Sequence, residues 1–193
     1  MKRVYFFTII CTALLIFSCA GIKDIGLTQT IDRKIESEGI KSAEQLTAFF
    51  VSNNPSANKK EVFKLAKYYV KEAAYEGINS DVAFVQMCLE TGFLRFGNLV
   101  TADMHNYCGL GAIDATRTGE RFATMELGVR AHIQHLHAYG STRQLKGDLI
   151  DRRYKYVQPR GKAKDIYGLA GTWAADLEYG KKLEKLISVL ETF

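Results

Sequence analysis

The chain has 193 residues, a length that ordinarily forms one domain and is too short for two large independent cores. Hydrophobic residues make up 47% of it and charged residues 24%, which excludes a disordered chain and a multispanning membrane protein. The 26 lysines and arginines outnumber the 21 acidic residues, for a net charge of +5. This balance is too weakly basic for a dedicated nucleic-acid binder, so nucleic acid is not an expected partner.

Residues 1–18 have the pattern of a secretory signal. Two basic residues precede an uncharged run that ends at Phe17, and this run is shorter than the roughly 20 residues of a membrane-spanning helix. The sequence Ile-Phe-Ser-Cys that ends at Cys19 resembles a bacterial lipoprotein box, in which the cysteine is acylated and becomes the first residue of the mature chain. We therefore predict an exported protein, periplasmic or at the cell surface, anchored in a membrane by lipid on Cys19. Plain secretion is the alternative.

Residues 19–41 follow as the lipidated N-terminus and a tether, because they lack periodic apolar spacing. A folded domain is predicted over residues 42–193. Its first three helices each follow a polar cap: Ser42 with Gln45 three residues later, Asn58, and Asn79. The third helix is apolar nearly all round over residues 82–89, which predicts a buried helix at the centre of the domain.

Helical periodicity disappears between residues 97 and 122, where four glycines predict loops or a small hairpin lobe. A fourth helix is expected up to Gly140, followed by a basic, irregular segment over residues 151–165. Asp176 is expected to open a final helix. The predicted fold is mainly α with a minor β element.

Glu90 is the most informative position for chemistry, because it ends the apolar third helix. Burial disfavours an ionised carboxylate, and so does the negative end of a helix dipole. Both effects raise a carboxyl pKa, as suits a general acid that must stay protonated near neutral pH. The alternative is a glutamate that frays into solvent at the helix end.

Several ordered motifs resemble the glucosaminidase family of peptidoglycan hydrolases, glycoside hydrolase family 73. They are LETGF at residues 89–93, NYCGLG at 106–111, GVRAHIQ at 128–134, and more weakly YGLAGTWA at 167–174 with Asp176 and Tyr179. The resemblance covers roughly residues 42–190 and implies a lysozyme-like fold, in which a small β-hairpin or loop lobe flanks a substrate groove. It also implies that Glu90 is the catalytic acid that cleaves β-1,4 bonds of cell-wall glycan after N-acetylglucosamine.

A second carboxylate is usual in glycosidases, either to activate water or to act as nucleophile. The candidates between residues 97 and 122 are Asp103, Asp114 and Glu120. Similar enzymes place this residue on the hairpin lobe, so Glu120 fits best and Asp114 is the alternative. Substrate-assisted catalysis by the 2-acetamido oxygen remains open, with Tyr179 or Asn106 orienting the sugar.

The resemblance also assigns substrate-binding residues. The loop from Asn106 to Gly111 reads as a groove wall, in which Gly109 permits close approach of a sugar and Asn106 offers a donor and an acceptor to an acetamido group. An ordinary tight turn is the alternative. Trp173 and Tyr179 are candidates for stacking on sugar rings, against the alternative of core packing. Two more residues of the motifs, Phe93 and Tyr107, are assigned to substrate binding.

Cys88 and Cys108 are candidates for a disulfide, since an exported protein meets an oxidising compartment. Two unrelated buried cysteines are the alternative. Three histidines on the fourth helix, His132, His135 and His137, lack a ligand set for zinc and are expected to pack or hydrogen-bond. No metal or cofactor is expected.

Six basic residues lie between positions 152 and 164, interleaved with two tyrosines. They form either a solvated loop or a surface that attracts anionic wall polymer or stem-peptide carboxylates. Taken together, the sequence predicts a membrane-anchored, monomeric enzyme that hydrolyses peptidoglycan strands. A lytic transglycosylase and a non-catalytic cell-wall-binding lipoprotein are the competing interpretations.

Overall fold

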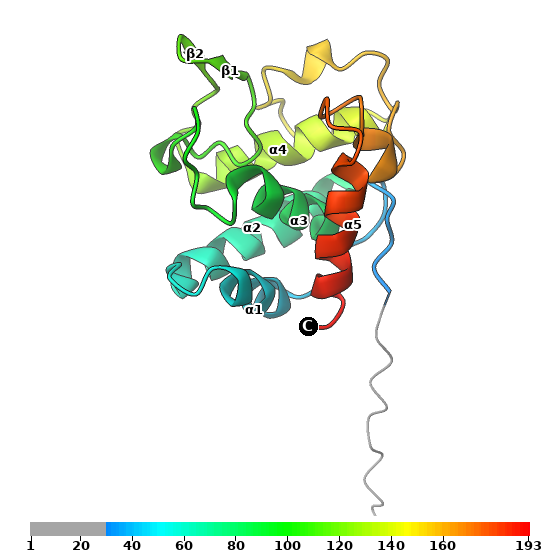
Figure 1. Cartoon of the computed structure of the whole chain (residues 1–193). Helices are drawn as coiled ribbons and strands as arrows, with labels where there is room; N and C mark the ends of the chain where they lie inside the picture. Colours follow the sequence, from blue (N-terminus) through cyan, green and yellow to red (C-terminus); the bar gives the residue numbers. More distant parts are fainter. Residues whose placement is uncertain (1–29) are drawn as a thin grey trace, which may run out of the picture.

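The computed structural model describes residues 30–193 (Figure 1). The predicted signal and the lipidation site at Cys19 lie outside the described residues. Within residues 30–193 the α-helices are α1 (Ala43–Asn53), α2 (Lys59–Glu76), α3 (Ser80–Thr91), α4 (Met125–Gly140) and α5 (Tyr179–Leu190). Short 3-10 helices are η1 (Ala102–Met104), η2 (Tyr154–Tyr156) and η3 (Tyr167–Leu169), and the strands are β1 (Ala112–Asp114) and β2 (Arg117–Thr118). No helix of this part of the chain is both long and apolar enough to cross a membrane.

The predicted caps begin the first three helices. Ser42 and Gln45 form a reciprocal capping box at α1, and the Asn58 and Asn79 side chains accept bonds from the first backbone N–H groups of α2 and α3. The last helix differs from the prediction. It begins at Tyr179, because the Asp176 side chain accepts the Glu178 N–H and closes a turn before the helix.

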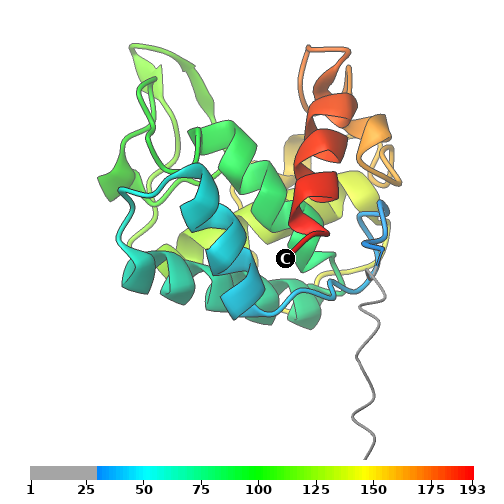
Figure 2. The same ribbon diagram turned by 60° about the horizontal axis from the view of Figure 1, so that its bottom comes forward.

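Helix α3 lies at the centre of the helical body (Figures 1 and 2). Every residue from Ser80 to Cys88 is buried, as the apolar pattern predicts. Helices α1, α2, α4 and α5 all pack against α3. Because its neighbours enclose it, the only part of α3 that reaches the surface is its C-terminal end, at Leu89 and Glu90.

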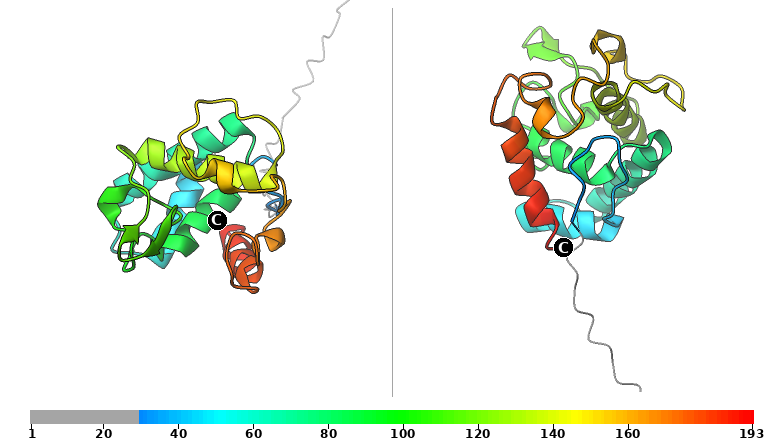
Figure 3. Two further views of the ribbon diagram at one scale, coloured as in Figure 1. Left: turned by 90° about the horizontal axis from the view of Figure 1, so that it is seen from above. Right: turned by 90° about the vertical axis from the view of Figure 1, so that its right-hand side faces the viewer.

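Residues 31–41 are part of the folded domain, so the predicted tether boundary at residue 41 is wrong. Ile31 and Ile35 are fully buried in the core. Arg33 forms ion pairs with Glu184 on α5 and with Glu191, which follows α5, and Figures 1 and 3 show the segment beside this helix. The segment has no regular secondary structure and bends at residues 35–37, so it buries isolated isoleucines without a helical period.

The lobe between α3 and α4 contains η1 and the antiparallel pair of β1 and β2. Figure 2 shows this lobe and the loop before α5 rising from the same side of the helical body. The predicted lysozyme-like arrangement of a mainly helical body with a small β lobe is confirmed.

Candidate active site

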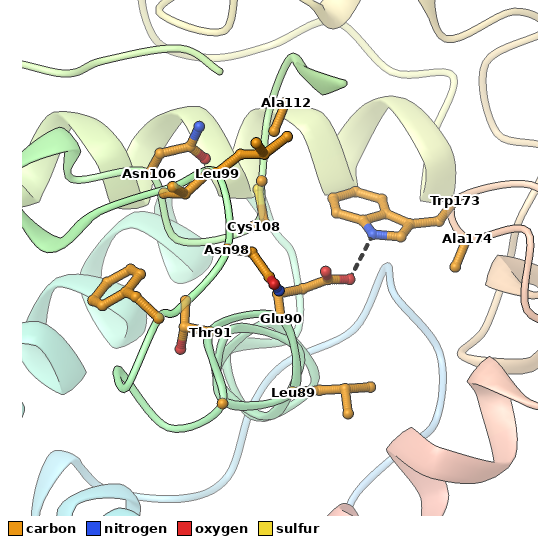
Figure 4. A pocket seen from close by; sticks show the side chains of 14 residues that line it. Leu89, Glu90, Thr91, Asn98, Leu99, Asn106, Cys108, Ala112, Trp173 and Ala174 are labelled. Atoms are coloured by element: carbon orange, nitrogen blue, oxygen red, sulfur yellow. Dashed lines mark hydrogen bonds between the residues drawn. The ribbon is translucent and has the colours of Figure 1, made fainter. Parts of the chain in front are cut away.

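A groove cavity of about 570 Å³ lies at the end of α3 (Figure 4). Three segments line it: residues 89–100 at and after the end of α3, the lobe loop with Cys108 and Gly109, and Trp173 with Ala174 before α5. Gly109 has φ 70°, a left-handed conformation that a residue with a side chain adopts only with strain.

The Glu90 carboxyl group is on the wall of this groove, and Figure 4 shows it directed toward Trp173. Its Oε1 accepts a bond of 3.0 Å from Trp173 Nε1 and a second bond from the Tyr179 hydroxyl. Among the described residues, no hydrogen bond engages Oε2. One oxygen of the acid is therefore held by the protein, while the other is free to meet a ligand.

Burial raises the pKa of Glu90, and the hydrogen bonds from Tyr179 and Trp173 oppose this effect without cancelling it. The direction is the one that the sequence predicts, but the surroundings differ from the prediction. Glu90 is accessible from the open groove, whereas its carboxyl group is crowded by protein atoms on the inner side. The crowding, rather than complete enclosure, disfavours the charged form.

A buried chain of hydrogen bonds supports Tyr179 from behind. Gln86 Nε2 donates to the Tyr179 oxygen at 3.0 Å, and Gln86 Oε1 lies 3.0 Å from His132 Nε2. His132 Nδ1 lies 2.8 Å from the Tyr69 hydroxyl. Burial lowers the pKa of His132 to about 3, so the ring is neutral. Since an amide oxygen only accepts, His132 Nε2 donates to Gln86 and Nδ1 accepts from Tyr69.

Gln86 is a site residue that the sequence analysis missed. The signal was present, because a glutamine lies one helical turn before Glu90 in an otherwise apolar helix. His132 takes the hydrogen-bonding role expected for these histidines, and His135 Nδ1 bonds to the buried Asp151 at 2.7 Å. No cluster of three metal-binding side chains exists in residues 30–193.

Asn106 lines the groove, as predicted, but its amide group is bonded within the lobe. It is 1% exposed, and its Nδ2 donates to the carbonyls of Leu110 and Glu120 at 2.9 and 3.0 Å. Its Oδ1 accepts the Leu110 N–H at 2.9 Å. These bonds join the two sides of the lobe, so Asn106 shapes the groove wall instead of reaching for a sugar.

Phe93 and Tyr107 lie elsewhere than predicted. Phe93 packs against Phe49 and Phe50, with ring centroids 5.7 and 5.5 Å away, and is half-buried against the core. Tyr107 is 4% exposed and borders a separate cavity of about 460 Å³ between α2 and the lobe. Neither residue lines the groove of Glu90. For Phe93 the cause is the sharp turn after α3, where this residue itself has a positive φ.

None of the three candidate second carboxylates lines the groove cavity. Asp114 accepts from Thr116 and Arg117 in the hairpin turn, and Asp103 accepts from Thr101 and pairs with Arg121, both at 2.6 Å. These bonds lower the pKa of each aspartate to about 2. The Glu120 carboxylate has a single, long contact of 3.6 Å with Arg152. Of the three carboxylates, Glu120 thus has the weakest interactions with other side chains.

The proposed disulfide between Cys88 and Cys108 is not formed, and both residues are free buried thiols. Cys88 lies in the core of α3, whereas Cys108 belongs to the loop on the groove wall. Burial raises the pKa of both thiols, so they remain neutral small apolar side chains.

The helical body, the small β lobe and an acid at the end of the central helix define a lysozyme-like protein. The chain belongs to the glucosaminidase family, whose model is described as mannosyl-glycoprotein endo-beta-N-acetylglucosaminidase and matches residues 66–192. An uncharacterized protein of Borreliella burgdorferi is 40% identical over 151 residues, which cover 78% of this chain and 74% of the relative. No solved structure matches. Family membership supports a glycosidase activity on peptidoglycan in general terms.

Proposed function

We propose that the protein hydrolyses β-1,4 bonds of peptidoglycan on the reducing side of N-acetylglucosamine, with Glu90 as the general acid. The single observation that carries this proposal is the Glu90 carboxyl group, which has a raised pKa, faces a groove and has Oε1 held by two donors. A proton on Oε2 is then positioned to pass to the departing glycosidic oxygen.

The bond changes are as follows. The glycosidic C–O bond breaks as Oε2 gives its proton to the leaving oxygen, and positive charge develops at the anomeric carbon. A water molecule attacks this carbon, and its proton passes to a base, to which we assign Glu120. Assistance by the 2-acetamido oxygen of the substrate is the alternative. Glu120 fits this role better than Asp114 because its carboxylate has no short hydrogen bond or ion pair that stabilises it elsewhere.

The proposal extends to location. A signal over residues 1–18 would export the chain, and lipid on Cys19 would hold it at a membrane next to the wall. The 11 residues between Cys19 and the buried Ile31 would then separate the anchor from the domain. Metabolic labelling with a fatty acid tests this part: the wild type should take up label, and the Cys19→Ala variant should not.

The activity is tested by digesting purified glycan strands with the wild type, Glu90→Gln and Glu120→Gln. Thermal unfolding must show that all three are equally folded. We expect a loss of about a hundredfold or more for Glu90→Gln, in line with general acid catalysis. Near-full activity of this variant would refute the acid assignment, and full activity of Glu120→Gln would refute Glu120 as the base.

The products distinguish hydrolysis from the competing reactions. Mass spectrometry should find reducing N-acetylglucosamine ends. A 1,6-anhydro-muramyl end would instead identify a lytic transglycosylase. Binding to wall material without any released sugar would identify a non-catalytic binding protein.

A further inference from the structure

We propose that a second cavity, on the far side of Trp173 from Glu90, is a subsite for a carboxylate carried by the glycan substrate. This inference rests on the proposed function and adds to it a preference for anionic over amidated strands. The carboxylate has two sources of the same chemistry: the lactyl group of a peptide-free muramyl residue, or an acidic group of a stem peptide.

The cavity continues the catalytic groove. It has a volume of about 290 Å³ and shares Cys108, Gly109 and Trp173 with the groove of Glu90. Binding pockets for whole small molecules begin at roughly this size, so the space suits one substituent of a sugar rather than another sugar ring. A strand that passes Glu90 would therefore place a substituent beyond the indole.

Trp173 is a rigid divider between the two cavities. Its ring packs against the rings of His135 and Tyr139, with centroids 5.2 and 5.1 Å away. Its Nε1 is fixed on Glu90 at 3.0 Å. The same side chain thus contacts the acid and borders the second cavity, so a ligand there would be held in register with the bond to be cleaved.

The lining of the second cavity is cationic and aromatic. The Arg153 guanidinium lies over the Tyr156 ring, 4.8 Å from its centroid, and both residues line the cavity. Lys162 Nζ lies 4.9 Å from the centroid of Tyr139, which also lines it. Arg153 is thus the cation of the lining itself, whereas Lys162 contacts the lining through the Tyr139 ring.

Neither of these cations has an acidic partner within the described residues. Arg152, next in sequence, lies 3.6 Å from Glu120, but no ion pair or side-chain hydrogen bond engages Arg153. The nearby Asp151 is fully buried and bonds to His135 Nδ1 and to the Arg153 backbone N–H. Because no acidic side chain of the described residues pairs with Arg153, its guanidinium retains its planar donors for a carboxylate from outside.

The test compares one glycan in two forms, one with free carboxylates and one with the same groups converted to methylamides. Peptide-free and peptide-bearing strands form separate arms, which distinguish the two sources. Arg153→Gln is the variant, and Lys185→Gln is the control, since it removes the same charge from an exposed position on α5.

For Arg153→Gln we expect kcat/KM on the charged strand to fall about fivefold, which is the upper limit for the loss of a solvent-accessible ion pair. The fall should come from a higher KM, with kcat unchanged. The amidated strand should be cleaved equally well by the variant and the wild type, and added salt should reduce the difference on the charged strand. Lys185→Gln should match the wild type on both strands.

Equal losses on both strands, or no loss on either while Glu90→Gln is inactive, would overturn the subsite and leave the proposed function intact.

A binding experiment tests the subsite separately from the proposed hydrolysis. Glu90→Gln protein, with and without Arg153→Gln, is titrated with charged and amidated fragments. A preference for the charged fragment that disappears with Arg153→Gln supports the subsite even if no strand is hydrolysed, whereas equal binding refutes it.

Discussion

Replacing Tyr179 with phenylalanine removes one of the two donors on Glu90 Oε1. A donor to a carboxylate stabilises the charged form, so its loss must raise the pKa of Glu90 further above its ordinary value. A general acid works while protonated, and activity is lost as pH rises through its pKa. The alkaline limb of the pH–rate profile should therefore move to higher pH in Tyr179→Phe, even if the maximum rate falls.

The size of the shift follows from the contact that is lost. A hydrogen bond to a charged group contributes about 1.5–3 kcal/mol, and about 1.4 kcal/mol corresponds to one pKa unit. Trp173 remains in place and continues to stabilise the carboxylate. We therefore expect the low end of this range, a shift of about one pH unit.

Two titratable side chains near Glu90, Cys108 and His132, stay neutral in this range. Burial raises the pKa of the Cys108 thiol, and burial lowers the pKa of His132 to about 3, so both stay neutral while Glu90 titrates. Neither group therefore adds a titration step to the alkaline limb.

The assay is kcat/KM for glycan hydrolysis from about pH 4 to 9, with Tyr167→Phe as the matched control. The Tyr167 hydroxyl also donates to a glutamate, Glu184 Oε2 at 2.9 Å, but neither residue lines the groove. Its removal should leave the limb unchanged. A limb in Tyr179→Phe that stays fixed, or moves to lower pH, would refute the assigned donor and the role of Glu90.

Gln86→Met should shift the limb in the same direction by less than Tyr179→Phe, because the tyrosine hydroxyl is kept but loses its orienting donor; an unshifted profile would contradict this. Arg33→Met should lower the free energy of unfolding at pH 7 by about 1–2 kcal/mol, the discounted value of partly exposed ion pairs. Arg33 lowers the pKa of Glu184 from 4.5 to about 2, so the wild-type advantage should be complete above about pH 4.5 and should shrink as pH falls toward 2, in urea titrations at each pH. Ile35→Ala should cost about 2–4 kcal/mol in the same titrations, whereas a residue of a free tether would cost nothing.

The helical part of the fold could be predicted because its signals are local. The Asn58 and Asn79 side chains bond to N–H groups two or three residues away, so the sequence itself contains both partners. The burial of Ile35 could not be predicted in this way, since its environment comes from α3, α4 and the segment near Lys164, more than 40 residues distant. An extended segment without periodicity gives no sign of what it packs against.

In the site, too, some features could be predicted from local sequence signals and others could not. Glu90 could be located from the apolar helix that it ends and from the motif around it. The roles of Asn106 and Phe93 depend on how the chain turns after α3, where Phe93, Leu94 and Phe96 all have positive φ values. Residues with side chains rarely adopt this conformation, so the orientation of these side chains could not be predicted from the residue types.

The buried chain behind Tyr179 fixes which oxygen of Glu90 carries the proton. Its donors all point one way: Tyr69 to His132, His132 to Gln86, Gln86 to Tyr179, and Tyr179 to Glu90 Oε1. Tyr179 already accepts from Gln86, so its own hydrogen is directed at Oε1. The indole N–H of Trp173 can only donate, and it meets the same oxygen. A proton on Oε1 would face two donors, which leaves Oε2, the oxygen without a protein partner, as the acidic one.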